Sequence, residues 1–157
     1  MAARLDSAHV RHAVVDDVEW IYGLLSHFAA QEQLLARSRD DLFEHLQEFL
    51  VAERGDLPLG VVALHVYSHS LAEIRSLAIA PLHQRQGVAR QLIAAAEEWA
   101  CQLGITRMFA LTYVQQLFIK QGYHLVSKES LPHKVWTVCI HCDRFANCDE
   151  VAVERWL

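Results

Sequence analysis

The feature that most constrains the fold is a strand, a long amphipathic helix and a second strand in direct succession. Residues 72–80 are predicted to form a strand, which Pro81 ends. Over residues 87–103 the apolar side chains recur at helical spacing, and Gly104 stands where helices commonly end in glycine. Residues 107–112 are predicted to form the next strand. This succession predicts two parallel strands joined by a right-handed crossover.

The strand over 72–80 carries a change of phase. In a regular strand every second side chain points to the same face. Ile74 is in one phase of this two-residue alternation, whereas Leu77 and Ile79 are in the other. A slip of one residue moves the side chains that follow to the other face of a sheet, so the pattern predicts a β-bulge.

The rest of the chain is predicted to supply antiparallel strands and further helices. Asp16 and Asp17 offer an N-cap to the first helix, and Asp41, three residues after Ser38, resembles the partner residue of a capping box in the second. The other expected elements are, in chain order, an edge strand over 10–15, a helix over about 18–28, a helix from Ser38 with the stripe Leu42, Phe43, Leu46, Phe49 and Leu50, strands over 49–53 and 59–67 around a hairpin turn at Gly55, Asp56 and Pro58, a short helix over 115–121 and a strand over 123–126. The predicted fold class is α/β (α+β), a mixed, mostly antiparallel twisted sheet with helices on both faces.

Size and charge narrow the class of protein. The 157 residues are expected to form a single domain over 1–157, with 131–157 as a cysteine-containing C-terminal extension. The net charge is −5 and no basic stripe occurs, which argues against nucleic acid as a partner. The first ten residues lack the apolar region of a signal peptide, and no apolar run approaches the roughly 20 residues of a membrane span. We therefore expect a cytoplasmic protein without membrane contact, and the sequence leaves open whether it forms a homodimer.

The C-terminal extension has the composition of a zinc site without its spacing. Cys139, Cys142 and Cys148 lie near His141, but they do not form the two cysteine pairs of a zinc ribbon. Free structural thiols are the favoured interpretation and structural zinc is the alternative. No metal ligand is therefore included among the expected site residues.

The most informative stretch is 84–90, Gln-Arg-Gln-Gly-Val-Ala-Arg, between a predicted strand and the long helix. A helix N-terminus exposes unpaired N–H groups and the positive end of the helix dipole, so it attracts phosphate. Gly87 and the small Ala89 would let a pyrophosphate approach the backbone, and Arg85 and Arg90 would add charge at the rim. The alternative is an ordinary loop capped by glycine. The motifs of nucleoside-triphosphate and dinucleotide loops are absent from the sequence.

This stretch resembles the signature of the GNAT acetyltransferase superfamily, Gln/Arg-x-x-Gly-x-Gly/Ala, at Gln84, Gly87 and Ala89. The order of elements over residues 10–123 also resembles that family. The resemblance implies acetyl-CoA as cosubstrate, with its pantetheine arm on the backbone of the bulged strand, where an N–H supports the thioester oxyanion. The residues that it assigns to acetyl-CoA are Leu77, Ala78, Ile79, Gln84, Arg85, Gln86, Gly87, Val88, Ala89 and Arg90.

Within the superfamily the chain is similar to the acetyltransferase domain of bacterial N-acetylglutamate synthases, in a short form without the amino-acid-kinase domain. The similarity lies in four blocks, residues 34–38, 72–79, 109–112 and 131–134. It implies an N-acetyltransferase for a small amine, an amino acid such as L-glutamate, whose product N-acetylglutamate serves arginine biosynthesis. Two alternatives stay open: a GNAT enzyme for a different small amine, and a regulatory module that binds acetyl-CoA without turnover.

Arg37 is the expected substrate-binding residue, because a guanidinium binds a carboxylate through two parallel hydrogen bonds. The other interpretation is a surface arginine at the start of a helix, where the dipole disfavours a cation. The synthases have a further arginine shortly after their Leu-Thr pair, and here Tyr113 and Val114 stand in that region. Lys134 or Lys120 would then bind the side-chain carboxylate.

Acetyl transfer to an ammonium group needs a base, and the resemblance indicates Glu73, acting directly or through water. The alternative is a solvated strand carboxylate paired with Arg75. Many GNAT enzymes reprotonate the CoA thiolate with a tyrosine, and Phe118 occupies that position here. The role of this catalytic acid is therefore vacant or moves to Tyr113, while Tyr123 is expected in the core.

Overall fold

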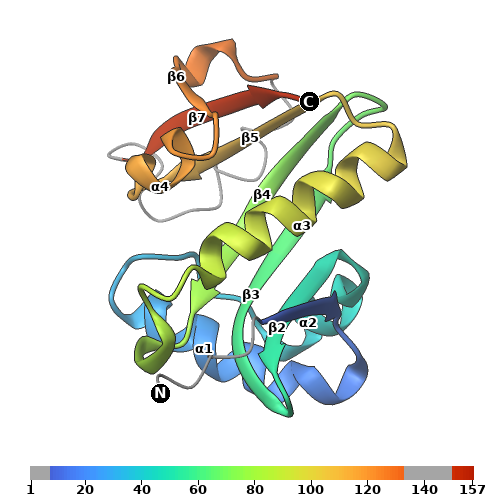
Figure 1. Ribbon diagram of the computed structural model, residues 1–157, viewed down its shortest axis with the longest axis vertical. Helices are drawn as coiled ribbons and strands as arrows, with labels where there is room; N and C mark the ends of the chain where they lie inside the picture. Colours follow the sequence, from blue (N-terminus) through green and yellow to red (C-terminus); the bar gives the residue numbers. More distant parts are fainter. Residues whose placement is uncertain (1–7, 133–149) are drawn as a thin grey trace, which may run out of the picture. The chain divides into compact units, whose positions relative to one another are not determined.

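The computed structural model describes residues 8–132 and 150–157. Its strands are β1 (His9–His12), β2 (Phe49–Arg54), β3 (Leu57–Val66), β4 (Leu71–Ile79), β5 (Arg107–Thr112), β6 (His124–Val126) and β7 (Val151–Trp156). Its α-helices are α1 (Val18–Ala30), α2 (Arg39–Glu44), α3 (Val88–Leu103) and α4 (Gln115–Ile119). Hydrogen bonds join the strands in the order β1-β2-β3-β4-β5-β7-β6 (Figure 1), which confirms the mixed, mostly antiparallel sheet. Within these residues no helix is long and apolar enough to cross a membrane.

The chain forms two compact units, each built from two separate segments. Among the described residues, the first unit contains 8–63 and Ser76–Ala96, and the second contains Leu64–Arg75, 97–132 and 150–157. The elements β3, β4 and α3 each begin in one unit and end in the other, so one strand or helix contributes to two packing units.

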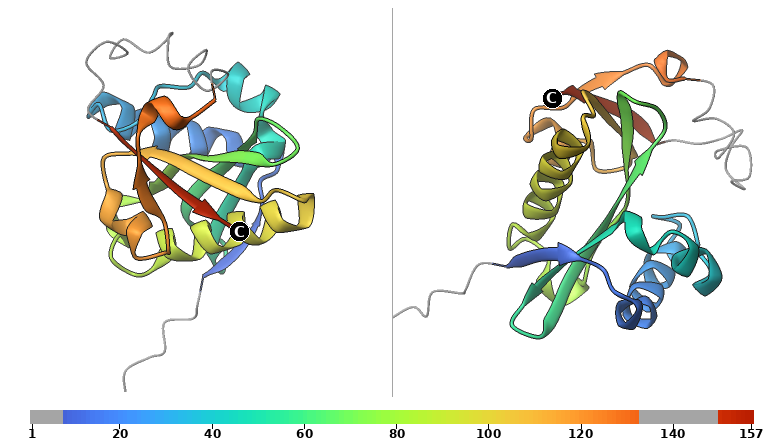
Figure 2. Two further views of the ribbon diagram at one scale, coloured as in Figure 1. Left: turned by 90° about the horizontal axis from the view of Figure 1, so that it is seen from above. Right: turned by 90° about the vertical axis from the view of Figure 1, so that its right-hand side faces the viewer.

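In the first unit, helices cover both faces of an antiparallel sheet. β2 pairs with β1 on one side and with β3 on the other. α1 and α2 lie on one face and the first part of α3 on the opposite face (Figure 2). The α3 face is tightly packed at Gly60, where a Cβ atom would lie 2.6 Å from the Cδ1 atom of Ile79 and 3.2 Å from that of Leu92. The core under α1 and α2 consists of Val18, Ile21, Leu24, Leu25, Leu42, Phe49, Val51, Val61, Ala63 and Ala78.

In the second unit, β5 lies between β4 and β7. It pairs with β4 in parallel at residues 71–73, which confirms the parallel strands predicted around the long helix. It pairs with β7 in antiparallel fashion along its whole length, and β7 in turn pairs with β6. The apolar cluster of this unit contains Leu71, Phe109, Leu131 and Ala152.

The second helix is shorter than its apolar pattern predicts. Ser38 is its N-cap, as expected, and the Oγ atom of Ser38 accepts a hydrogen bond from the Asp41 N–H at 3.1 Å. However, α2 ends at Glu44, and Phe49 and Leu50 belong to β2. Their assignment to the helical stripe was wrong. A short apolar run fits the 3.6-residue period of a helix as well as a strand, and pairing with β3 selects the strand here.

The strand β7 was not predicted from the sequence. It lies within residues 131–157, which were expected as an extension, and its backbone bonds to β5 from the pair Arg107–Trp156 to the pair Thr112–Val151. The end of the chain is therefore part of the sheet of the second unit.

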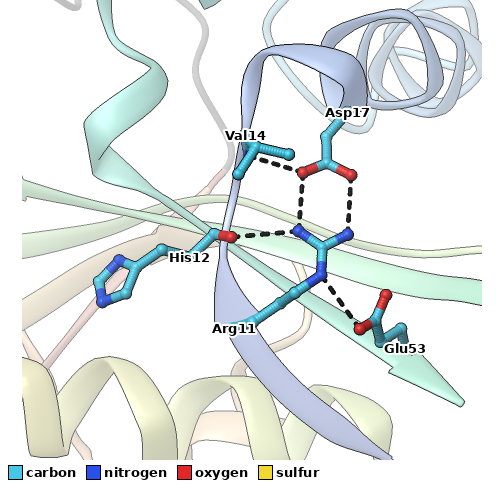
Figure 3. Close-up of polar contacts among 5 residues, drawn as sticks. All are labelled: Arg11, His12, Val14, Asp17 and Glu53. Atoms are coloured by element: carbon cyan, nitrogen blue, oxygen red, sulfur yellow. Dashed lines mark hydrogen bonds and ion pairs between the residues drawn. The ribbon is translucent and has the colours of Figure 1, made fainter. Parts of the chain in front are cut away.

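Asp17 occupies the expected N-cap position of α1 but its side chain caps no helical N–H. Instead it accepts hydrogen bonds from Arg11 at 2.8 and 2.9 Å and from the backbone N–H of Val14 at 2.7 Å (Figure 3). The Nε atom of Arg11 also lies 3.1 Å from a carboxylate oxygen of Glu53. This cluster ties the edge strand β1 to the start of α1 and to β2.

Candidate functional site

The loop before α3 presents the open N-terminus of that helix to solvent. Residues 84–87 are exposed, and Arg85 and Gly87 have left-handed φ angles of 61° and 81°. The Gln91 N–H donates to the Gly87 carbonyl at 3.1 Å, so the N–H groups of residues 88–90 precede the first intrahelical bond. This geometry is suited to binding a phosphate group.

Cations accompany these N–H groups. Both Nη atoms of Arg54, at the end of β2, lie 3.5 Å from the Oε1 atom of Gln86. Arg85 and Arg90 are exposed. An anion at the loop would therefore meet a helix N-terminus together with guanidinium groups.

The strand segment next to the loop has the irregularity that its sequence predicts. Ser76 has a φ angle of 51°, a left-handed conformation that is unusual for serine in a strand, at the place expected for the bulge. Beyond it, the buried Ala78 and the half-buried Leu77 and Ile79 complete β4. The Nε2 atom of Gln84 donates to the Ile79 carbonyl at 3.4 Å and links this segment to the loop.

Arg37 lies beside the same irregular residue. Its side chain is 12% exposed, its Nε atom donates to Asp41 at 2.6 Å and its Nη1 atom donates to the Ser76 hydroxyl at 3.3 Å. Its guanidinium also lies over the Phe49 ring, 5.0 Å from the centroid. Because α2 begins at Arg39, Arg37 precedes the helix, and it is a largely buried cation rather than a surface one.

Glu73 lies in the second unit and is 6% exposed. Its Oε1 atom forms an ion pair with Arg75 and accepts a hydrogen bond of 3.3 Å from the Tyr67 hydroxyl. The Nη2 atom of Arg75 donates to the same hydroxyl at 2.7 Å, which closes a ring of three side chains. Burial raises the pKa of Glu73 above its ordinary value, while Arg75, His65 and Tyr67 oppose this rise. The pairing of Glu73 with Arg75 is thus present, but in a buried environment.

The other expected site residues are dispersed or lie outside the described part of the chain. Tyr113 follows β5 and is 39% exposed, and Lys120 follows α4 and is exposed. Tyr123 is 3% exposed and contacts Phe118 edge-on, as expected of a core residue. Outside the described residues lie Lys134 and the three cysteines Cys139, Cys142 and Cys148. Residues 8–132 and 150–157 contain no cluster of side chains able to hold a metal ion.

Two contact residues of the candidate site, Ser76 beside Arg37 and Tyr67 beside Glu73, were missed by sequence reasoning. The phase change in β4 located the irregular residue Ser76 but gave no reason to connect it with Arg37, which is 39 residues away in the sequence. Tyr67 follows β3 and reaches Glu73 only because the chain turns back after it, with the Tyr67 N–H bonded to the Leu71 carbonyl at 2.9 Å. The sequence carries no separate signal for that contact.

Comparison with known proteins supplies the family context. The model of the acetyltransferase (GNAT) family matches residues 14–123. An uncharacterized N-acetyltransferase of Chlorobaculum tepidum is 33% identical over 148 residues, which cover 94% of this chain and 96% of that protein. An amino-acid acetyltransferase of Vibrio cholerae is 30% identical over 125 residues, which cover 78% of this chain but 28% of that longer protein.

Among solved structures, N-acetylglutamate synthase from Neisseria gonorrhoeae, in complex with coenzyme A and N-acetyl-glutamate, is similar with a TM-score of 0.88 and 28% identity. The match covers 96% of this chain and 35% of the synthase chain. This chain therefore corresponds to about a third of that protein's length.

Proposed function

Because the chain belongs to the acetyltransferase (GNAT) family, we propose that it transfers the acetyl group of acetyl-CoA to the α-amine of an amino acid. The proposed acceptor is L-glutamate and the proposed product is N-acetylglutamate, the first intermediate of a route to arginine. The Vibrio relative, an amino-acid acetyltransferase, and the Neisseria synthase with its bound N-acetyl-glutamate support this choice of acceptor.

One observation carries the amino-acid assignment: a largely buried guanidinium adjoins the strand segment proposed to bind acetyl-CoA. Arg37 touches Ser76, and Leu77 to Ile79 follow directly in β4. A carboxylate bound by Arg37 would therefore place the attached amine close to that segment. Removing a charge from water costs free energy, so a buried cation whose position is fixed by partners favours a role in ligand binding.

The side chain of Arg37 keeps N–H groups with which it can bind a carboxylate. A guanidinium has five N–H groups. The described partners use one of them at Nε, for Asp41, and one at Nη1, for Ser76. The terminal Nη atoms keep further N–H groups with which to form two parallel bonds to an acceptor carboxylate.

The proposed reaction forms one amide bond and breaks one thioester bond. Glu73 takes a proton from the acceptor ammonium, directly or through water, and the free amine attacks the thioester carbonyl. An N–H of the Leu77–Ala78–Ile79 backbone stabilises the oxyanion. The tetrahedral intermediate then loses its second ammonium proton to solvent and expels the CoA thiolate, and Tyr113, which recovers its own proton from solvent, is the proposed donor of the proton that converts the thiolate to the thiol.

Release of CoA thiol from acetyl-CoA, measured with each of the twenty amino acids and a set of small amines, tests this proposal. We expect L-glutamate to give the highest kcat/KM and N-acetylglutamate to be detected by mass spectrometry. Release with a different class of amine alone would replace the acceptor assignment. Tight binding of acetyl-CoA without release for any amine would instead support a regulatory module.

A further inference from the structure

We propose that Arg75 and Tyr67 are positioning residues for Glu73: they fix its carboxylate and keep it in the charged form that accepts a proton from the acceptor amine. The inference rests on the proposed function, in which Glu73 is the base. It adds two residues to which neither the family match nor the resemblance assigns a role.

The geometry that supports the proposal is a closed ring. Arg75 lies two residues after Glu73 in β4, so both side chains project from the same face of the strand. The Oε1 atom of Glu73 forms the ion pair with Arg75 and accepts a bond of 3.3 Å from the Tyr67 hydroxyl, and that hydroxyl accepts a bond of 2.7 Å from Arg75. The ring restricts the carboxylate to one orientation.

The ring is itself held by aromatic packing. The Tyr67 ring lies 5.7 Å from the Phe109 ring and 4.8 Å from the His65 ring. Phe109 is fully buried and is the β5 residue that pairs with Glu73. The Tyr67 ring therefore packs against residues of two strands, His65 of β3 and Phe109 of β5, which suits a residue that orients another.

The charge balance explains why a base at this position needs Arg75. A carboxylate that is 6% exposed and unpaired would take up a proton, and a protonated carboxyl cannot act as a base. Burial raises the pKa of Glu73, and Arg75 gives the largest opposing effect, followed by His65 and Tyr67. The result is a carboxylate that is more basic than an exposed glutamate and is protected from premature protonation by a fixed cation.

A purely structural ion pair is the competing explanation, and the same unit contains a matched example of one. Arg107 donates to Glu154 at 2.6 Å, and Glu154 is 4% exposed. This Arg–Glu pair resembles the Arg75–Glu73 pair in residue types and burial but is not part of the proposed catalytic machinery. Tyr123 provides a second control, since its buried hydroxyl has no hydrogen-bond partner among the described residues.

The experiment is the pH dependence of kcat/KM for the amino acid in Arg75→Met, Arg75→Lys and Tyr67→Phe. Removing the cation raises the pKa of Glu73. The acid limb of the pH–rate profile, where kcat/KM falls at low pH, should therefore move to higher pH by at least about one unit in Arg75→Met. Tyr67→Phe should move it in the same direction by less, and Arg75→Lys should restore most of the original position. Arg107→Met and Tyr123→Phe should leave the limb where it is, even if Arg107→Met lowers the melting temperature as much as Arg75→Met.

His65 is a further group whose charge lowers the pKa of Glu73, so His65→Gln is measured alongside. A limb that disappears in His65→Gln but survives in Glu73→Gln would belong to the histidine and would overturn the proposal. An unshifted limb in folded Arg75→Met would overturn it as well. If that variant does not fold, an unshifted limb in Tyr67→Phe has the same consequence.

Glu73→Gln separates this inference from the proposed function. Should Glu73→Gln keep full activity, the base assignment itself fails. Should it lose the acid limb while Arg75→Met and Tyr67→Phe retain it unshifted, only the positioning role fails.

Discussion

Arg11 and Asp17 are joined by two parallel hydrogen bonds of 2.8 and 2.9 Å, the bidentate geometry in which a guanidinium binds a carboxylate most strongly (Figure 3). The pair connects β1 to the residue that precedes α1. Asp17 is 14% exposed at its side chain, so solvent screens the pair only in part.

Asp17→Asn should destabilise the protein at neutral pH by about 1–2 kcal/mol, since it removes a charge-assisted pair. The hydrogen bond from Arg11 lowers the pKa of Asp17 in the folded state. The stabilisation is therefore complete above the unfolded pKa of about 4 and is lost as the pH falls through the lower folded value.

Denaturant unfolding at pH 7 and at acidic pH checks this, with the exposed neighbour variant Asp16→Asn as control. The stability difference between the wild type and Asp17→Asn should shrink on acidification. A difference that is the same at both pH values would show that the charge of Asp17 does not contribute to the free energy of unfolding.

Gly87→Glu should abolish binding of acetyl-CoA while the protein remains folded, because a carboxylate would meet the pyrophosphate at the N-terminus of α3. Gly87 has a φ angle of 81°, so any side chain there also adds strain of about 1 kcal/mol or more. Gly104→Glu is the matched control: Gly104 has a φ angle of 88°, and a Cβ atom would have open space at both glycines.

Isothermal titration calorimetry with CoA measures the effect. Comparable loss of stability in both variants, with loss of binding only in Gly87→Glu, supports the phosphate loop. Unchanged affinity in folded Gly87→Glu would remove the loop from the acetyl-CoA site.

Long periodic segments and the cap of the second helix were predictable from the sequence, whereas the side-chain cap expected at the first helix is not formed by Asp17. The helix α3 differs from its predicted range of 87–103 by one residue, and β5 matches its range, because many successive residues support a single periodicity. The Ser38 cap was found for a different reason, since a hydroxyl three residues before an N–H makes a purely local contact.

Contacts that depend on the tertiary arrangement were not predictable. Phe49 and Leu50 fit a helical stripe and a strand equally well until their pairing with β3 is known. Likewise, the strand β7 acquires its place only through pairing with β5 and β6. In the candidate site, the sequence indicated Arg37 and Glu73 but not the partners, Ser76 and Tyr67, that fix them.

Glu73→Gln should reduce kcat/KM for the amino acid by roughly 10²–10⁴-fold near neutral pH, because the acceptor ammonium loses its proton acceptor. The loss should be much smaller at high pH, where the amine is already free. Glu154→Gln, which neutralises another buried carboxylate paired with an arginine, should leave the pH–rate profile unchanged. A profile that is the same for Glu73→Gln and wild type would mean that the substrate loses its proton to solvent or to another group.

Arg37→Ala should raise the KM for the amino acid and leave the KM for acetyl-CoA almost unchanged. Loss of a bidentate pair in a largely buried site removes on the order of 2–4 kcal/mol of transition-state binding. Arg37→Lys should recover only part of it, because an ammonium cannot form the planar fork. Arg39→Ala is the control, since Arg39 is 52% exposed and pairs with Glu19.

The most direct test compares kcat/KM for L-glutamate and for its α-amide in the wild type and in Arg37→Ala. If Arg37 binds the α-carboxylate, wild type should strongly prefer L-glutamate, and Arg37→Ala should lose that preference because the amide lacks the charge that the guanidinium binds. If Arg37→Ala lowers kcat/KM for both acceptors by the same factor, or for neither, Arg37 does not recognise the carboxylate and the amino-acid assignment loses the observation that carries it.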